Sequence, residues 1–276
     1  MNAGWVLTAE GREVAARATA DLEAFFGPGW RARAEARPAS ERPAWPATFV
    51  ELVTLWASLR ILIQQGVQGI SKLRANLSRN ATRDEYRHGT LQARLATQAL
   101  LAGTRPILEP PIGDIRLNDL LLELRGLNPA GPATTRRLIR AVELKAKQTR
   151  DSTAVWVWIE DAGALPEFPR VDILAEDLDR VFTAWPHLLG VVLSTLTPHT
   201  ADTTERFERG ISYTRHLPDT RHRHTVIAHR PALPEHRFEL IHHLCAEEPA
   251  WLDAALPLLQ VPGGLPSLLT RRNPAR

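Results

Sequence analysis

The sequence contains very little cysteine, methionine or lysine: its 276 residues include one cysteine, one methionine and three lysines. The lone cysteine, Cys245, excludes an internal disulfide framework and a cysteine-rich zinc site. No apolar run approaches the roughly 18 residues that a membrane-spanning helix needs. The first residues also lack a basic segment followed by an apolar one, which is the pattern of a secretory signal. We therefore expect a cytoplasmic protein.

Arginine takes the place of lysine almost everywhere in the chain. Of 34 basic residues, 31 are arginines, and the three lysines are Lys72, Lys145 and Lys147. One explanation is a GC-rich genome, which favours arginine codons. The other is that the retained lysines lie where a guanidinium would not serve. The net charge of +3 permits binding of a polyanion without requiring it.

The pattern of apolar residues divides the chain into three regions. We expect an N-terminal helical region over 1–80, an α/β core over 81–200 and an Arg- and His-rich C-terminal helical extension over 201–276. In the core we expect, in chain order, helix 84–102, strands 105–109, 113–117 and 120–127, helix 135–148, strand 153–160, helix 174–188 and strand 190–195.

The most informative feature is a charged residue inside an apolar strand. Glu123 interrupts the stretch Leu120–Leu127, and an ionised carboxylate there is costly unless it is paired or bound to a metal. Alternation along the strand places Glu123 and Arg125 on one face. Asp114 opens the partner strand of the predicted hairpin, so it can lie near Glu123. Two carboxylates and a cation can hold a divalent metal ion and polarise a phosphate oxygen.

In this order of elements, these residues resemble the restriction-endonuclease-like nucleases, the PD-(D/E)XK superfamily. In that family an Asp begins the second strand of a helix–strand–strand–strand–helix–strand core, and a Glu/Asp-X-Lys triplet lies on the third strand. Asp114, in the sequence PPIGD, matches the first position and Glu123 the second. The resemblance implies an α/β fold in which this core is flanked by helical N- and C-terminal segments. It also implies that Asp114 and Glu123 bind Mg²⁺ or Mn²⁺.

Arg125 stands where the family has its lysine. Because arginine stays protonated it cannot act as a general base, although it can hold a scissile phosphate through two hydrogen bonds. Some members of the family carry the lysine on the following helix, where this chain has Lys145 and Lys147. The resemblance therefore implies Asp114, Glu123, Arg125 and Lys145 as catalytic residues, with Lys147 as the alternative to Lys145.

A second register is open for the same motif. Glu143-Leu144-Lys145 is itself a Glu-X-Lys triplet, and residues 141–147 fit an alternating strand. Against this, Leu138, Val142 and Lys145 share a face at helical spacing, and a helix is what connects two parallel strands. The helix is the better interpretation.

The resemblance implies a metal-dependent nuclease that hydrolyses phosphodiester bonds, with DNA as the favoured substrate, in a DNA-processing or defence system. Either a homo-oligomer or a partner protein is compatible with this class. The alternative is a non-catalytic binding or scaffold protein on a degenerate nuclease-like fold, with Glu123 and Arg125 as a structural ion pair. An unrelated α/β domain is a third interpretation. If Asp114 and Glu123 lie close together, the nuclease is favoured; if Arg125 fills the space beside a sealed Glu123, the scaffold is favoured.

Histidine and tryptophan offer weaker candidates. Seven of the ten histidines fall between His216 and His243, which fits a solvated basic loop better than a zinc site, because no ligand at a matching spacing after His229 completes the set that His222 and His224 would begin. His88, on the helix before the core, can approach the site or face solvent. Trp156 and Trp158 lie in an apolar strand, so we expect them in the core.

Overall fold

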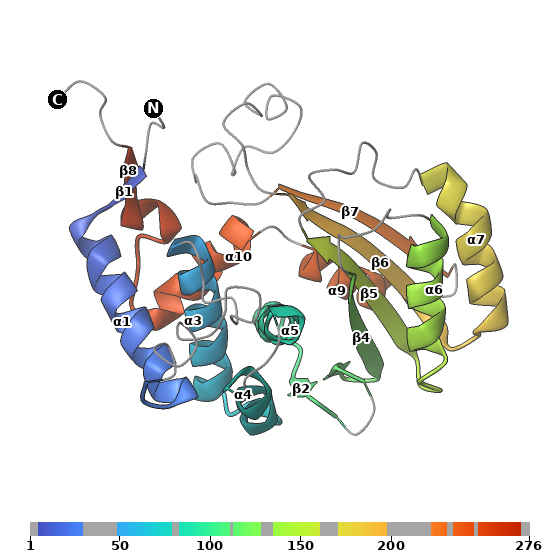
Figure 1. Cartoon of the computed structure of the whole chain (residues 1–276), viewed down its shortest axis with the longest axis horizontal. Helices are drawn as coiled ribbons and strands as arrows, with labels where there is room; N and C mark the ends of the chain where they lie inside the picture. Colours follow the sequence, from blue (N-terminus) through green and yellow to red (C-terminus); the bar gives the residue numbers. More distant parts are fainter. Residues whose placement is uncertain are drawn as a thin grey trace.

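Figure 1 shows the computed structural model of the chain, which describes residues 5–29, 49–78, 83–110, 113–127, 135–160, 171–197, 222–230, 234–245 and 248–271. Its helices and strands form an α/β arrangement around one mixed sheet. Among the described residues, no helix has the length and apolar character needed to cross a membrane.

Six strands lie in the order β2–β3–β4–β5–β6–β7. The strands are β2 (Pro106–Leu108), β3 (Ile115–Leu117), β4 (Leu120–Leu127), β5 (Thr153–Glu160), β6 (Leu188–Thr197) and β7 (His222–His229). The neighbours β4, β5 and β6 run parallel, whereas β2–β3, β3–β4 and β6–β7 are antiparallel pairs. Helices α6 (Thr135–Ala146) and α7 (Val171–Ala184) lie between the parallel strands in sequence, because parallel neighbours need a long crossover connection.

Helices cover both faces of this sheet (Figure 1). Helix α5 (Arg83–Leu101) and helix α9 (Glu235–Leu244) pack on one face, and α6 and α7 pack on the other. Strand β5 shows the consequence, since Trp156 and Trp158 join the core on the α5 side while Val155 and Val157 join the core on the α6 side. All four are at most 5% exposed, as expected of a central strand with two buried faces.

The N- and C-terminal segments pack together beyond α5. The helices here are α1 (Ala9–Phe26), α3 (Phe49–Gln64), α4 (Ile70–Ser78), α10 (Glu248–Ala255), η3 (Leu256–Leu259) and η4 (Leu265–Leu268). Strand β1 (Trp5–Leu7) pairs antiparallel with β8 (Leu269–Arg271), so the two ends of the described chain lie side by side. The hydrophobic core runs without interruption from α1 through α5 to the near face of the sheet.

The element order predicted for the core region is confirmed. The strands over 120–127 and 153–160 have the predicted bounds, and the stretch 135–146 is a helix, which removes the alternative strand register at Glu143. The expected helix over 174–188 is placed too late, because α7 ends at Ala184 and Leu188 already belongs to β6.

The region 201–276, predicted as a helical extension, also contains two strands in its described part, β7 and the short β8. Strand β7 pairs with β6 from Gly190 to Thr197 and forms one edge of the sheet. Basic and histidine residues fill the first half of this strand, so the apolar periodicity that reveals the other strands is missing.

Candidate active site

The candidate site lies beside the first residue of β3, where β4 extends past its partner strand. The last β3–β4 pair is Ile115 with Leu122, so β4 extends beyond its partner toward Leu127. Asp114, which immediately precedes β3, takes over the open edge, because the Leu124 N–H donates a hydrogen bond of 2.6 Å to its Oδ2. Gly113 has a φ of 86°, a left-handed conformation that glycine adopts without strain. The chain thus turns so that the carboxylate of Asp114 continues the hydrogen-bonding edge of the sheet.

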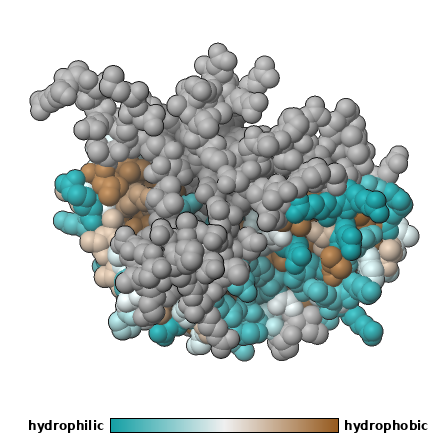
Figure 2. Space-filling model, in the orientation of Figure 1, coloured by the Kyte–Doolittle hydropathy of each residue, from teal (hydrophilic) through white to brown (hydrophobic). Residues whose placement is uncertain are grey.

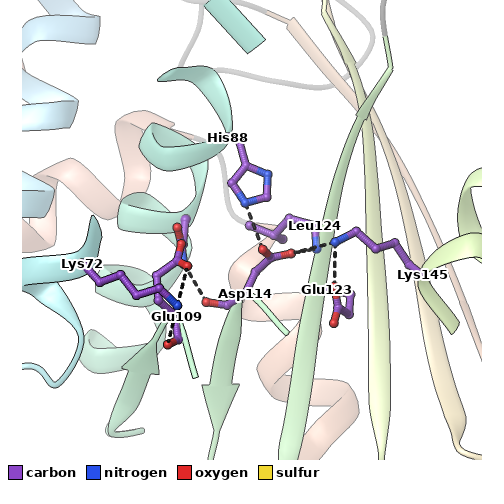
Figure 3. Close-up of polar contacts among 8 residues, drawn as sticks. Lys72, His88, Glu109, Asp114, Glu123, Leu124 and Lys145 are labelled. Atoms are coloured by element: carbon purple, nitrogen blue, oxygen red, sulfur yellow. Dashed lines mark hydrogen bonds and ion pairs between the residues drawn. The ribbon is translucent and has the colours of Figure 1, made fainter. Parts of the chain in front are cut away.

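Asp114 is held from two further directions, as Figure 3 shows. His88 of α5 lies with its Nε2 3.0 Å from Oδ1, and Lys145 of α6 lies with its Nζ 3.3 Å from Oδ2. One turn along α5 from His88, the Gln92 side chain donates a 2.6 Å hydrogen bond to the main-chain oxygen of Asp114. The carboxylate is therefore fixed by groups from three separate elements.

Glu123 lies deeper than Asp114. It pairs with Val155 across β4–β5 and shares the α6 side of the sheet with that residue, and its side chain is 3% exposed against 14% for Asp114. Lys145 Nζ donates a 2.7 Å hydrogen bond to Glu123 Oε2. A buried carboxylate of this kind needs a charged partner, and Lys145 is that partner.

One ammonium group thus bridges two carboxylates that come from different strands. We call Asp114, Glu123 and Lys145 the carboxylate cluster. Lys145 is 15% exposed, so the cluster opens to solvent through Asp114 and Lys145, with Glu123 beneath them. Lys147, which follows the last residue of α6, is exposed. Of the two candidate lysines, the structure brings Lys145 to the carboxylates.

The two carboxyl groups respond differently to the same surroundings. Burial pushes the pKa of Asp114 up, but the hydrogen bond and charge of His88, the charge of Lys145 and the Leu124 N–H together hold that pKa below its usual value. For Glu123, burial and the negative charge of Asp114 outweigh the contact with Lys145, so the pKa of Glu123 is raised. Asp114 is thus stabilised as an anion, whereas Glu123 is an anion only at a cost.

Arg125 does not join the cluster. It is exposed and lies on the same face of β4, two residues beyond Glu123, where it lines a pocket with Arg137 and Arg140. Among the described residues, no hydrogen bond or ion pair joins Arg125 to Asp114 or Glu123. Within the described part of the chain, Glu123 and Arg125 therefore do not form the expected structural ion pair. Lys145 is the cationic partner of Glu123 instead.

Sequence reasoning left His88 undecided and missed Gln92. His88 and Gln92 are four residues apart on α5, so both face Asp114 from one side of the helix. Gln92 is fully buried in a stretch where Thr97 and Gln98 are buried as well. Polar residues at helical spacing on a buried helix face were the available signal, because such groups require partners.

A second lysine also lies close to the Asp114 turn. Lys72 of α4 approaches Glu109 Oε2 at 3.5 Å, and the Glu109 N–H donates to the main-chain oxygen of Asp114 at 3.0 Å. Glu109 has a φ of 47°, so the chain turns sharply here before β3 (Figure 3). Lys72 is 59% exposed, and this pair therefore supports the turn from outside rather than extending the carboxylate cluster.

The donors present suit a hard divalent cation that keeps much of its own hydration. Within the described ranges there is no group of three or more His, Cys, Asp and Glu side chains placed to hold a metal ion. Asp114 and Glu123 supply two carboxylates, and Mg²⁺ commonly binds proteins through one or two carboxylates while water and phosphate oxygens complete its shell. Asp114 and Glu123 are therefore the residues of the cluster that could hold such an ion, whereas two carboxylates do not make the four-ligand set of a structural zinc ion.

The other sequence candidates take no part in the contacts that the structure describes for the carboxylate cluster. His216 falls outside the described residues, whereas His229, His242 and His243 are exposed. Cys245 packs against the core at the end of α9. Comparisons of the chain with protein-family models, with curated proteins and with solved structures find no match.

Proposed function

We propose that this protein is a metal-dependent nuclease with a restriction-endonuclease-like core, which hydrolyses phosphodiester bonds and favours DNA. One observation carries the proposal: a lysine from the helix after β4 contacts both an aspartate at the start of β3 and a glutamate on β4. This arrangement corresponds to the family pattern in which the lysine has moved from the strand to the helix. We place the protein in a DNA-processing or defence system on the same resemblance.

Asp114 and Glu123 are the residues that would hold Mg²⁺ or Mn²⁺. When bound, such an ion supplies Lewis-acid polarisation of a phosphate oxygen and lowers the pKa of a water molecule. Asp114 presents its carboxylate at the opening of the cluster, and Glu123 lies beneath it. His88 and the Leu124 N–H fix the orientation of Asp114, so that little reorganisation is needed when substrate arrives.

Lys145 has two tasks that suit an ammonium group. It has three donors on a compact centre, so it can remain bonded to both carboxylates while a third hydrogen points outward. That hydrogen can orient the attacking water or a phosphate oxygen, and its charge offsets the extra negative charge of the pentavalent phosphorus. A planar guanidinium presents its donors in a fixed fork and cannot replace these contacts. The chain's rare use of lysine is explained at this position.

The scaffold alternative also draws on a specific observation. Glu123 is 3% exposed and already has a cationic partner in the fold, which is what a structural ion pair looks like. The two functions predict different responses to neutral substitution. A structural pair loses stability when one charge is removed, because the remaining buried charge has no partner. A metal site loses activity but tolerates the loss of one carboxylate charge.

Cleavage assays with labelled DNA and RNA test the proposal directly. Wild-type protein is expected to cleave in Mg²⁺ or Mn²⁺ and not in EDTA, and Glu123→Gln and Asp114→Asn are expected to lower the rate by about 100-fold or more. Glu143→Gln is the matched control, because Glu143 is an exposed glutamate on α6, two residues before Lys145. Equal cleavage by wild type and Glu123→Gln would reject the site, and absence of cleavage by wild type on both nucleic acids would favour the scaffold.

A further inference from the structure

A pocket lies beside the carboxylate cluster on the same strand and helix. It has a volume of about 340 Å³, at the lower end of pockets that hold small ligands. Strand β4 contributes Arg125 and Leu127, and helix α6 contributes Arg137, Arg140 and Leu144. We call it the arginine pocket. None of its lining residues is acidic.

Two of the arginines that line this pocket can offer their charge to a ligand. Arg125 and Arg140 are exposed, and neither forms an ion pair with any carboxylate that the structure describes. Guanidinium groups on two facing elements can bind a phosphate through paired hydrogen bonds, which makes arginine the preferred residue for this contact. The pocket is therefore an anion site by its donors and by its charge.

The apolar part of the lining indicates more than a free anion. Leu144 is 48% exposed, although its neighbours on the inner side of α6 are buried. Leu127 completes an apolar wall next to the arginines. Figure 2 shows hydrophobic surface set among hydrophilic surface on the side where α6 and α7 lie. A nucleotide has both parts of the matching ligand, an anionic phosphate and a sugar and base that can pack on leucine.

The pocket lies at a useful distance from the proposed catalytic residues. Glu123 and Arg125 share one face of β4, and two residues of strand separate them by roughly 7 Å. On α6, Ala141 lines the pocket one turn before Lys145. This separation is of the order of the step between neighbouring phosphates along an extended nucleic-acid strand. A strand can thus place one phosphate at the cluster and another in the pocket.

We propose that the pocket formed by Arg125, Arg137 and Arg140 binds a backbone phosphate next to the scissile one, so that the substrate is a polynucleotide strand lying along β4 and α6. This inference rests on the proposed function and extends it, because it distinguishes the residues that bind the nucleic-acid strand from those that hydrolyse its phosphodiester bond. An acidic protein is the competing ligand. The leucine wall and the phosphate-like spacing favour the polynucleotide.

Fluorescence anisotropy with a labelled oligonucleotide of about 20 nucleotides, in EDTA, measures binding without cleavage. Arg125→Gln and Arg140→Gln are expected to weaken binding by about tenfold each and to lower the slope of log K against log salt by about one. Both residues are exposed, so these substitutions should leave the fold intact. Arg136→Gln is the control, because Arg136 is an exposed arginine on α6 outside the pocket, and we expect less than a threefold change. Polyglutamate of equal charge should compete poorly with the oligonucleotide.

The outcomes separate this inference from the proposed function. If Arg136→Gln weakens oligonucleotide binding as much as the two pocket variants do, the proposed phosphate site is wrong. It is also wrong if polyglutamate competes as strongly as the unlabelled oligonucleotide. If the pocket variants bind like wild type while Glu123→Gln abolishes cleavage, the proposed phosphate site is rejected and the proposed nuclease activity is supported. If the pocket variants lose binding while the wild-type protein never cleaves, the phosphate site is supported and the nuclease activity is rejected.

Discussion

Two groups of charged residues share the β4–α6 surface and differ in how their charges are used. In the carboxylate cluster the charges face one another at 2.7 and 3.3 Å and are at most 15% exposed. In the arginine pocket, Arg125 and Arg140 are exposed and face a cavity. Buried and mutually balanced charges suit a site where chemistry occurs, because their strength is not lost to water. Exposed charges of one sign suit recognition of a polyanion.

The largest effect expected within this comparison is at Lys145. Lys145→Ala should lower the cleavage rate by about 100-fold or more, because it removes the cation at both carboxylates. Lys147→Ala, which changes an exposed lysine two residues away, should change the rate less than twofold. Cleavage rates under single-turnover conditions measure both. Similar losses for the two variants would mean that the helix carries general positive charge rather than one catalytic lysine.

His88 should have a smaller effect, since it acts through Asp114. His88→Ala removes the contact at Oδ1 and leaves the Leu124 N–H and Lys145 in place. We expect a loss of about tenfold to 100-fold in cleavage at limiting Mg²⁺, with half-maximal cleavage shifted to a higher Mg²⁺ concentration. His88→Gln retains a hydrogen-bond donor and should recover part of the loss. A rate equal to that of wild type for His88→Ala would remove His88 from the site.

The two carboxyl groups should have opposite effects on stability. The pKa of Asp114 is lowered in the fold, so its ionised form stabilises the protein above the ordinary aspartate pKa, and this contribution is lost as the pH falls through the folded value. The pKa of Glu123 is raised, so its ionisation costs stability as the pH rises from the ordinary glutamate pKa through the folded value.

Thermal unfolding checks these signs. At pH 8 without metal, Glu123→Gln should raise the melting temperature by about 2–4 °C and Asp114→Asn should lower it by a similar amount. The Glu123→Gln difference should shrink as the pH falls to the ordinary glutamate pKa, because Glu123, whose pKa is raised, is then protonated in the wild type. The Asp114→Asn difference should persist to lower pH, because the lowered pKa of Asp114 keeps that carboxyl ionised until the pH falls below the ordinary aspartate pKa. A loss of stability in Glu123→Gln that persists at every pH would instead support the structural ion pair.

The smallest effect is expected at a surface ion pair outside both groups. Arg116 and Asp151 contact each other at 2.9 Å, with side chains that are 30% and 50% exposed. Arg116→Gln should change the free energy of unfolding by less than about 1 kcal/mol and should leave cleavage and binding unchanged. Chemical denaturation measures the first and the assays above the second. A large change in cleavage would show that a charge on β3 outside the carboxylate cluster and the arginine pocket also contributes to activity. The division of roles between those two groups would then be incomplete.

Much of the fold follows from the sequence because its signals are local. The turn at Asn118-Asp119 and the apolar run after it define β4, and Asn118 does adopt a left-handed φ of 56°. Strand β7 was not predictable in this way, because its stability comes from pairing with β6 and not from its own pattern.

The site shows the same division. The carboxylates were predictable from charge in an apolar strand, and the phase of α6 already placed Lys145 on the buried face with Leu138 and Val142. Alternation along β4 predicts that Arg125 lies on the same face as Glu123, but it does not predict how far α6 covers that face. The exposure of Arg125 and the arginine pocket depend on this packing of α6 on β4, so the sequence could not predict them.

Single-turnover cleavage measured against enzyme concentration tests the central claim most directly, because it separates the plateau rate from the half-saturating concentration. Glu123→Gln is expected to lower the plateau by about 100-fold or more while the half-saturating concentration changes little. Arg140→Gln is expected mainly to raise the half-saturating concentration, by about tenfold, with a far smaller effect on the plateau. A Glu123→Gln plateau equal to that of wild type would contradict the account.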